Sequence, residues 1–274
     1  MYAAIDIGGT KTFAASLDDQ GVILQKIRFE TPKKYEDWLA ELKKAYAEIA
    51  AKDFRAAGIG CPATHLDRRR GVGVDFGNLP WKNVPIDHDV EQLLHCPAVI
   101  ENDAKLAALS EAMLVKDAYR KVLYVTISTG IGIGLVVDGK IDTSVGDGGG
   151  RTMLVEYKDK LVPWESFASG HAIVERYGKM AKDINDKKTW KAIVRDLSTG
   201  FLELIALTQP EVVVIGGSVG THFHKYGDLL KAELKKYQTP LFKVPALRGA
   251  GRPEEAVLYG GYDLAKATFT GDAS

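Results

Sequence analysis

The chain opens each of its halves with the same local pattern, and this repetition constrains the fold more than any other feature. Residues 2–6 are extended and apolar, Gly8 and Gly9 mark a turn, and residues 12–17 return as a second strand. Residues 122–128 are again a strand, followed by a glycine-rich turn and a returning strand over 133–137. We interpret the repetition as a duplication of two α/β domains. A coincidence of common hairpin chemistry is the alternative.

The segments between these hairpins alternate helices and strands. A third strand is expected over residues 22–29. Apolar spacing predicts a helix over residues 35–52, and a composition rich in Ala and Leu predicts one over 103–115. Further helices are expected over residues 165–180, 189–207, 226–237 and 254–266, and strands over residues 56–61, 98–100 and 211–215. We expect an N-terminal domain over residues 1–117 and a C-terminal domain over residues 118–274. The final helix, about 254–268, is placed to pack back on the N-terminal domain.

Composition excludes several classes of protein. The 274 residues are 46% hydrophobic and 26% charged, as in ordinary globular proteins. Lys+Arg and Asp+Glu both number 36, so the chain lacks the basic excess of a nucleic-acid or membrane-surface binder. Cys61 and Cys96 are too few for a disulfide scaffold and are expected to be packing residues. Without a signal peptide or an apolar run of about 18 residues, the expected location is cytoplasmic.

Three glycine turns follow apolar strands, at residues 8–11, 129–134 and 216–220. Ligands of open α/β sheets collect at the carboxyl ends of strands, and backbone N–H groups in such turns suit phosphate. The chain has no G-x-x-x-x-G-K-[ST] motif, and Leu135 stands where a Rossmann fingerprint needs glycine. A P-loop protein and a dehydrogenase are therefore not expected.

Two carboxylates stand at strand ends. Asp6 precedes the first glycine turn, where it could hold Mg²⁺ through water while Thr10 and the glycine amides take phosphates; the alternative is that it caps the turn. Asp103 lies between a buried strand and a helix, where it could accept the proton of an attacking hydroxyl. Its alternative role is a helix N-cap.

Four motifs occur in a distinctive order. They are Asp-Ile-Gly-Gly-Thr-Lys (6–11), Glu-Asn-Asp-Ala (101–104), Ser-Thr-Gly-Ile-Gly-Ile-Gly (128–134) and Val-Ile-Gly-Gly (214–217). Asn-Leu-Pro-Trp (78–81), Ala-Ser-Gly (168–170) and Glu-Ala-Val-Leu-Tyr-Gly (255–260) lie between or after them. With this set the chain resembles, over nearly its whole length, the sugar kinases of the ROK family, whose name covers repressors, open reading frames and kinases.

The resemblance implies a two-domain actin/hexokinase-like (ribonuclease H-like) α/β fold with Mg-ATP and a sugar in the interdomain cleft, and a glucokinase-like activity. For ATP it implies the first loop Gly8, Gly9, Thr10 and Lys11, the second loop Thr129, Gly130 and Gly132, and Gly216 and Gly217 by the adenosine. For the sugar it implies Asn78, Asn102 and Glu165, with Asp103 as the base. Members of this family often form homodimers.

The chain departs from the family pattern in one segment. Kinases of the family carry G-E-x-G-H, whose Glu and His contact the sugar and whose His binds zinc; residues 148–153 here are Gly-Gly-Gly-Arg-Thr-Met. No cysteine follows Cys96, so no zinc is expected. Arg151 could instead bind an anionic or differently decorated sugar, or be a plain surface arginine.

These observations favour an ATP-dependent hexose kinase, with glucose as the default substrate. One alternative is a non-catalytic sugar sensor, although the first motif begins at residue 6 and we expect no DNA-binding domain before it. Another is a kinase with polyphosphate as donor. Its nearest basic track is Arg68-Arg69-Arg70, a triplet that is also typical of a solvated loop.

Overall fold

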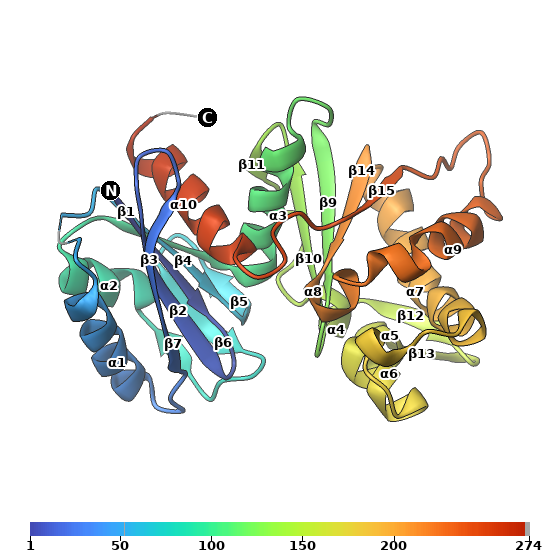
Figure 1. The fold of residues 1–274 in the computed structure, drawn as a ribbon, viewed down its shortest axis with the longest axis horizontal. Coiled ribbons are helices and arrows are strands. Elements are labelled where there is room, and N and C mark those ends of the chain that lie inside the picture. Colours follow the sequence, from blue (N-terminus) through green and yellow to red (C-terminus); the bar gives the residue numbers. More distant parts are fainter. Residues whose placement is uncertain (52, 272–274) are drawn as a thin grey trace. The chain divides into compact units, whose positions relative to one another are not determined.

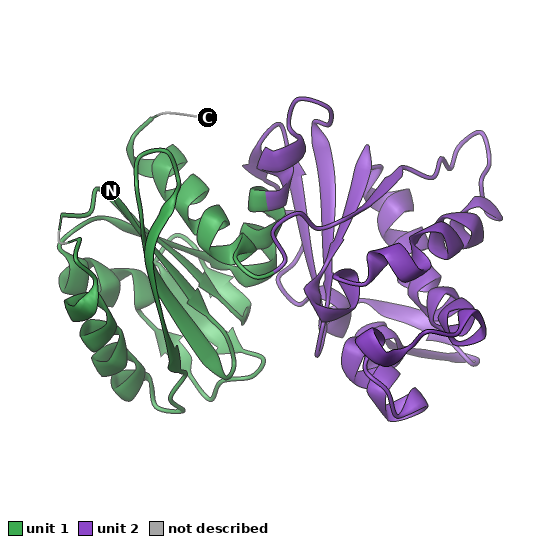
Figure 2. Cartoon of the chain, viewed as in Figure 1, with its two compact units in different colours: residues 1–110, 254–274 green, residues 111–253 purple. Residues whose placement is uncertain are grey.

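The computed structural model describes residues 1–51 and 53–271, which form two compact units (Figure 2). Unit 1 contains Met1–Ser110 and the chain from Glu254 onward, and unit 2 contains Glu111–Pro253. The sequence analysis divides the chain after residue 117 and expects the final helix of the second domain to pack back on the first. In the structure this helix, α10 (Ala256–Phe269), packs within unit 1 against strands β1 (Tyr2–Ile7) and β4 (Ala57–Cys61).

Unit 1 is built on a five-stranded sheet in the order β3–β2–β1–β4–β8 (Figure 1). Strands β2 (Lys11–Leu17) and β3 (Ile23–Glu30) are antiparallel to their neighbours, whereas β1, β4 and β8 (Ala98–Asn102) are parallel. Because side chains alternate between the faces of a strand, β1 contributes to two cores. Ala3, Ile5 and Ile7 pack in one core with helices α1 (Tyr35–Glu48) and α2 (Ile86–Leu94), and Tyr2 and Ala4 pack in another with α10.

Helix α1 ends earlier than the expected range of 35–52, in which residue 52 lies outside the described residues. After Glu48 the backbone becomes extended and buries the Ile49 side chain completely. The Gln25 side chain donates to the Glu48 carbonyl at 3.1 Å and accepts from the Ala50 N–H at 3.0 Å. A side chain of the neighbouring strand thus supplies the hydrogen bonds that another helical turn would have made.

The sequence analysis missed the elements between β4 and β8. A small antiparallel sheet is formed by β5 (Ala63–Asp67), β6 (Val72–Phe76) and β7 (Lys82–Val84), and α2 follows it. The Trp81 ring joins this segment to α1, since its centroid lies 5.3 Å from that of Tyr35 and 5.4 Å from that of Trp38. Helix α3 (Asp103–Val115) follows β8 over the predicted range.

Unit 2 repeats the sheet of unit 1, with the order β11–β10–β9–β14–β15. Strands β10 (Ile131–Val137) and β11 (Lys140–Ile141) are antiparallel to their neighbours, and β9 (Lys121–Ile127), β14 (Val212–Gly216) and β15 (Ala246–Gly249) are parallel. Order and strand directions agree between the two sheets, so the predicted duplication is confirmed.

The helices of unit 2 differ in part from expectation. The range 165–180 is divided into α5 (Glu165–Ala168) and α6 (Gly170–Tyr177), followed by a short 3₁₀ turn (Ala181–Asp183). The break falls at Ser169, whose extended backbone and hydroxyl cap α6 by accepting from Ala172 N–H.

The remaining elements of unit 2 complete its core and its edges. Helices α7 (Lys187–Thr208) and α9 (Phe223–Lys235) pack together through stacked Trp190 and Tyr226 rings, 4.8 Å apart. The short elements are α4 (Gly149–Thr152), β12 (Leu154–Tyr157), β13 (Lys160–Pro163) and α8 (Gly217–Gly220). None of the helices in the described ranges has the length and apolar character needed to cross a membrane.

Candidate functional site

The first glycine loop joins β1 to β2 at the carboxyl end of β1. Gly8 N–H donates to the Lys11 carbonyl at 2.9 Å and closes a tight turn with Thr10 at its exposed tip. A Cβ at Gly9 would lie 2.9 Å from the Cβ of Asn78, so only glycine fits this approach. The structure therefore brings the predicted sugar residue Asn78 against the predicted phosphate loop.

A chain of hydrogen bonds holds this loop from inside unit 1. Trp38 Nε1 donates to Thr12 Oγ1 at 3.1 Å, the Thr12 and Thr31 hydroxyls lie 2.9 Å apart, and Thr31 Oγ1 donates to the Gly8 carbonyl at 2.8 Å. Thr31 N–H also donates to the Thr10 carbonyl at 3.0 Å. No single motif in the sequence indicated this arrangement, because its members come from three different elements.

Asp103 is the first residue of α3, directly after β8. The preceding residue caps this helix, since Asn102 Oδ1 accepts from Ala104 N–H at 3.0 Å and from Lys105 N–H at 3.3 Å. Asn102 is therefore the N-cap residue of α3, and Asp103 Oδ1 also accepts from Ala104 N–H, at 2.7 Å. Asn102 also donates to the Ala63 carbonyl at 3.0 Å and is 4% exposed, so this predicted sugar residue has its side chain engaged inside unit 1.

The two predicted carboxylates of unit 1 influence each other electrostatically. They stand at the ends of β1 and β8, on either side of β4 and at the same edge of the sheet. Burial, with the negative charge of Asp103 as the smaller cause, raises the pKa of Asp6 from its ordinary value of 3.8 to about 7. The positive charge of a cation bound beside Asp6 would oppose both effects, because it favours the ionised carboxylate.

The second glycine loop lies in unit 2 between β9 and β10. Ser128 N–H donates to the Gly130 carbonyl at 2.9 Å across the exposed Thr129, and Gly132 continues as part of β10. A Cβ at Gly130 would lie 2.7 Å from Glu165 Oε2, which accepts from Ile131 N–H at 3.1 Å. The predicted sugar residue Glu165 is thus held on the predicted phosphate loop.

The turn from β14 into α8 lies beside the same loop. Gly217 has φ +77°, and a Cβ there would meet the Ile127 carbonyl oxygen at 2.5 Å. Since Ile127 ends β9, the Gly216–Gly217 turn and the 128–130 loop share one edge of the unit 2 sheet. Within unit 2, the structure brings together Thr129, Gly130, Glu165, Gly216 and Gly217.

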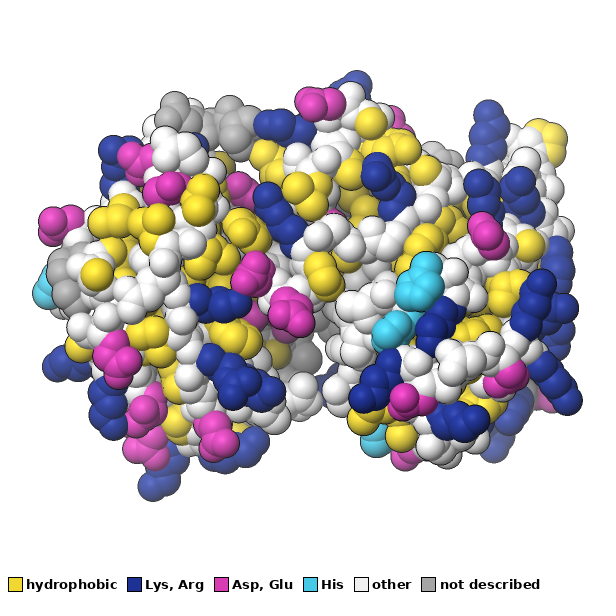
Figure 3. Space-filling model, viewed as in Figure 1, with side chains coloured by type: hydrophobic (Ala, Val, Ile, Leu, Met, Phe, Trp, Pro, Cys, Tyr) yellow, Lys and Arg dark blue, Asp and Glu magenta, His cyan; other side chains and the backbone are white. Residues whose placement is uncertain are grey.

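Two arginines singled out in the sequence have ion-pair partners. Arg151 Nε donates to Glu165 Oε1 at 3.1 Å, so the segment that departs from the family pattern contacts a predicted sugar residue. Arg68 Nε donates to Glu101 Oε2 at 2.7 Å, which leaves Arg69 and Arg70 as the exposed members of the basic triplet. Basic and acidic side chains occur next to each other on both units (Figure 3).

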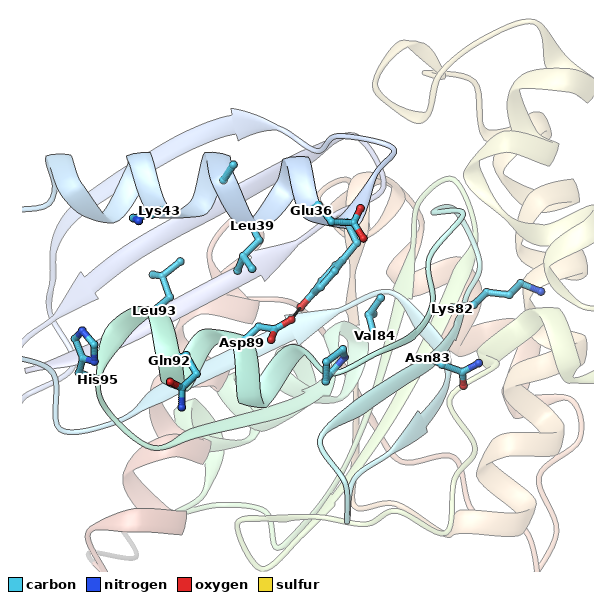
Figure 4. A pocket seen from close by; sticks show the side chains of 13 residues that line it. Glu36, Leu39, Lys43, Lys82, Asn83, Val84, Asp89, Gln92, Leu93 and His95 are labelled. Carbon is cyan, nitrogen blue, oxygen red and sulfur yellow. Dashed lines mark hydrogen bonds between the residues drawn. The ribbon is translucent and has the colours of Figure 1, made fainter.

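A hollow of about 980 Å³ lies elsewhere in unit 1, between α1 and α2 (Figure 4). Leu39, Val84 and Leu93 line it together with polar side chains, and the Tyr35 hydroxyl donates across it to Asp89 Oδ2 at 2.9 Å. None of the residues that the sequence predicts for the site lines this hollow. We therefore place the candidate site at the sheet edges.

Metal binding has one candidate carboxylate in unit 1. The described residues contain no group of three or more His, Cys, Asp or Glu side chains arranged to hold a metal ion. Mg²⁺ in phosphoryl-transfer sites is held by one or two carboxylates, water and the substrate phosphates. Asp6, at the base of the first glycine loop, fits that mode.

Comparison with known proteins gives a consistent family. The family model described as the ROK family matches residues 2–268. A glucokinase of Streptomyces coelicolor is 25% identical over 284 residues, covering 86% of both chains, and an N-acetyl-D-glucosamine kinase of Mannheimia succiniciproducens is 29% identical, covering 91% of this chain and 94% of its own. The crystal structure of a ROK hexokinase from Thermus thermophilus superposes with a TM-score of 0.80 at 28% identity, over 98% of this chain and 99% of that one. The fold is that of the actin/hexokinase-like sugar kinases, and the chain belongs to the ROK family.

Proposed function

We propose that the protein is an ATP-dependent sugar kinase that transfers the terminal phosphate of ATP to a hydroxyl of a hexose, with glucose as the first candidate. The observation that carries the proposal is the position of Asp103. Its carboxylate stands at the start of α3, at the sheet edge that also holds Asp6 and the first glycine loop. The sugar-kinase relatives of the family support it.

Asp103 is the proposed base that accepts the proton of the attacking hydroxyl. Such groups contribute about 10²–10⁴-fold to a rate. Gly8 to Lys11 and Thr129 to Gly132 would bind the phosphates through backbone N–H groups, where close packing at Gly9 and Gly130 excludes side chains. Asp6 would hold Mg²⁺ through water, and the ion supplies neutralisation of the triphosphate charge when bound.

The sugar would be held by Asn78 and Glu165, with Asn102 fixing the backbone beside Asp103. Glu165 is paired with Arg151, so its carboxylate presents less negative charge than an unpaired glutamate. The named relatives act on glucose and on N-acetyl-D-glucosamine, two hexoses that differ at one ring substituent. Glucose and its N-acetylated relatives are therefore the substrates to compare first.

The test is ADP release from Mg-ATP with glucose, mannose, fructose, N-acetylglucosamine and N-acetylmannosamine. We expect turnover on at least one sugar. Asp103→Asn should keep sugar binding but lower kcat by about 10²-fold or more, because the amide cannot take the proton. Asp117→Asn, an exposed carboxylate after the same helix, is the matched control and should retain wild-type kcat.

Other outcomes of this test assign the protein differently. Sugar binding without turnover in the wild type would identify a sugar sensor. Turnover with polyphosphate and none with ATP would change the donor. A wild-type kcat in Asp103→Asn would show that Asp103 is not the base.

A further inference from the structure

The turn between β5 and β6 carries a cation that the proposed phosphoryl transfer does not use. Arg68 Nε donates to Glu101 Oε2 at 2.7 Å, and Arg68 Nη2 donates to Oε1 of the same carboxylate. Glu101 is 4% exposed, whereas the Arg68 side chain is 28% exposed. A two-pronged guanidinium–carboxylate pair has a fixed geometry as well as opposite charges. Arg68 therefore holds a carboxylate that lies inside unit 1.

Glu101 in turn fixes the main chain next to Asp103. Its Oε1 accepts from Asn102 N–H at 2.7 Å. The Asn102 side chain donates to the carbonyl of Ala63, the first residue of β5, which leads into the Arg68 turn. The junction of β8 and α3 is thus tied twice to one short segment, once by Arg68–Glu101 and once by Asn102–Ala63.

Loss of Arg68 would disturb this junction for a simple electrostatic reason. A buried carboxylate without its cation is strongly disfavoured, so the Glu101 side chain would turn toward water. This movement weakens its bond to Asn102 N–H, and Asp103 is the next residue. A displacement of about 1 Å at a reacting group can cost on the order of 10²-fold in rate.

We propose that Arg68 is a positioning residue for Asp103, acting through Glu101, and that it does not bind the phosphate donor. The role rests on the proposed phosphoryl transfer. The proposal gives Arg68 a different role from its two basic neighbours. Arg68 supports the β8–α3 junction, whereas the exposed Arg69 and Arg70 do not take part in the pair with Glu101.

The kinetic test compares Arg68→Gln with Arg69→Gln, a change of the same charge one residue away. We expect Arg68→Gln to lower kcat by about 10–100-fold while the KM values for sugar and ATP stay within about threefold. Arg68→Lys keeps the charge without the two-pronged geometry, so its kcat should lie between those of Arg68→Gln and wild type. If Arg68→Gln does not fold, Arg68→Lys serves as the test variant. Arg69→Gln should behave as wild type.

A second measurement does not depend on activity. Hydrogen exchange of the peptide spanning residues 100–105 should be faster in Arg68→Gln than in wild type and unchanged in Arg69→Gln, because the bond from Asn102 N–H to Glu101 weakens only in the first variant. If no sugar is phosphorylated by the wild type, the proposed function fails, and faster exchange alone then supports the hold of Arg68 on the junction. Wild-type kcat in Arg68→Gln, a raised donor KM at full kcat, or unchanged exchange overturns the positioning role.

Discussion

Asp6 and Asp103 have different environments although both are carboxylates at strand ends. Asp6 belongs to β1, which pairs with β2 on one side and β4 on the other, and the pKa of Asp6 is raised to about 7. Asp103 is partly exposed at a helix start, where Asp103 Oδ1 lies 2.7 Å from Ala104 N–H. Asp103 thus accepts a hydrogen bond from the first turn of α3, whereas Asp6 lies within β1, in the interior of the sheet.

The mutual influence of these carboxylates is open to a direct titration. We expect the Asp6 carboxyl to titrate near pH 7 in the nucleotide-free protein, as followed by ¹³C NMR of labelled aspartates. In Asp103→Asn the midpoint should fall, since one cause of the raised pKa is removed, but it should stay above 3.8 because burial remains. Asp117→Asn should leave it unchanged. An identical midpoint in Asp103→Asn would show that the two charges do not interact.

At the scale of elements, the glycine loops depend on side chains from their neighbours. The loop after β1 is held by Thr31, which follows β3, and by Trp38 of α1 through Thr12. Thr31 is 7% exposed, so its hydroxyl has little access to water as another hydrogen-bond partner. The loop geometry is therefore a property of three elements together.

Thr31→Val tests this dependence with almost no change of shape. The Gly8 carbonyl and the Thr12 hydroxyl lose a buried partner, which should lower the free energy of unfolding by about 1–3 kcal/mol. The KM for ATP should rise more than the KM for the sugar, because the change acts on the phosphate loop. Urea unfolding and initial rates measure the two effects. Thr268→Val removes an exposed hydroxyl bonded within α10 and should change neither by a measurable amount.

The regular elements and the glycine turns could be predicted from sequence, but their side-chain partners could not. A composition rich in Ala and Leu was sufficient to predict α3, and the repeated hairpins predicted the antiparallel start of each sheet. Strand β15 at the edge of the unit 2 sheet was not predicted. The strands β5, β6 and β7 were missed because they are short and carry mixed polar residues. Arg68 and Glu101 are 33 positions apart, and only the folded sheet shows that they pair. The same holds for Arg151 and Glu165, which come together across the α4 turn.

At the scale of the whole molecule, proton binding links the fold to pH. Asp87, the second residue of α2, has a pKa raised to about 7 by burial and by the charge of Glu91, and its Oδ1 lies buried without a hydrogen-bond partner among the described residues. Asp6 has a similarly raised pKa. In the unfolded chain both carboxyls lose their protons near 3.8, whereas in the folded chain they keep them to about 7. Between these values the folded state binds more protons, so stability falls as pH rises.

The Asp87 contribution can be isolated with Asp87→Asn, which is neutral at every pH and nearly the same shape. From pH 5.5 to pH 8 the wild type should lose about 1–2 kcal/mol of unfolding free energy that the variant keeps. The Tm of the variant relative to that of the wild type should therefore be a few degrees higher at pH 8 than at pH 5.5. Burial lowers the pKa of His222, which has the opposite pH dependence, but this group is common to both proteins and cancels in the comparison. Asp117→Asn, at an exposed carboxylate, should follow the wild type at both pH values. Parallel pH dependence in Asp87→Asn and wild type would mean that Asp87 is already ionised in the folded protein well below pH 7. The turn around Gly71, whose carbonyl accepts from Asp87 N–H at 3.3 Å, would then open to admit water to the Asp87 carboxylate.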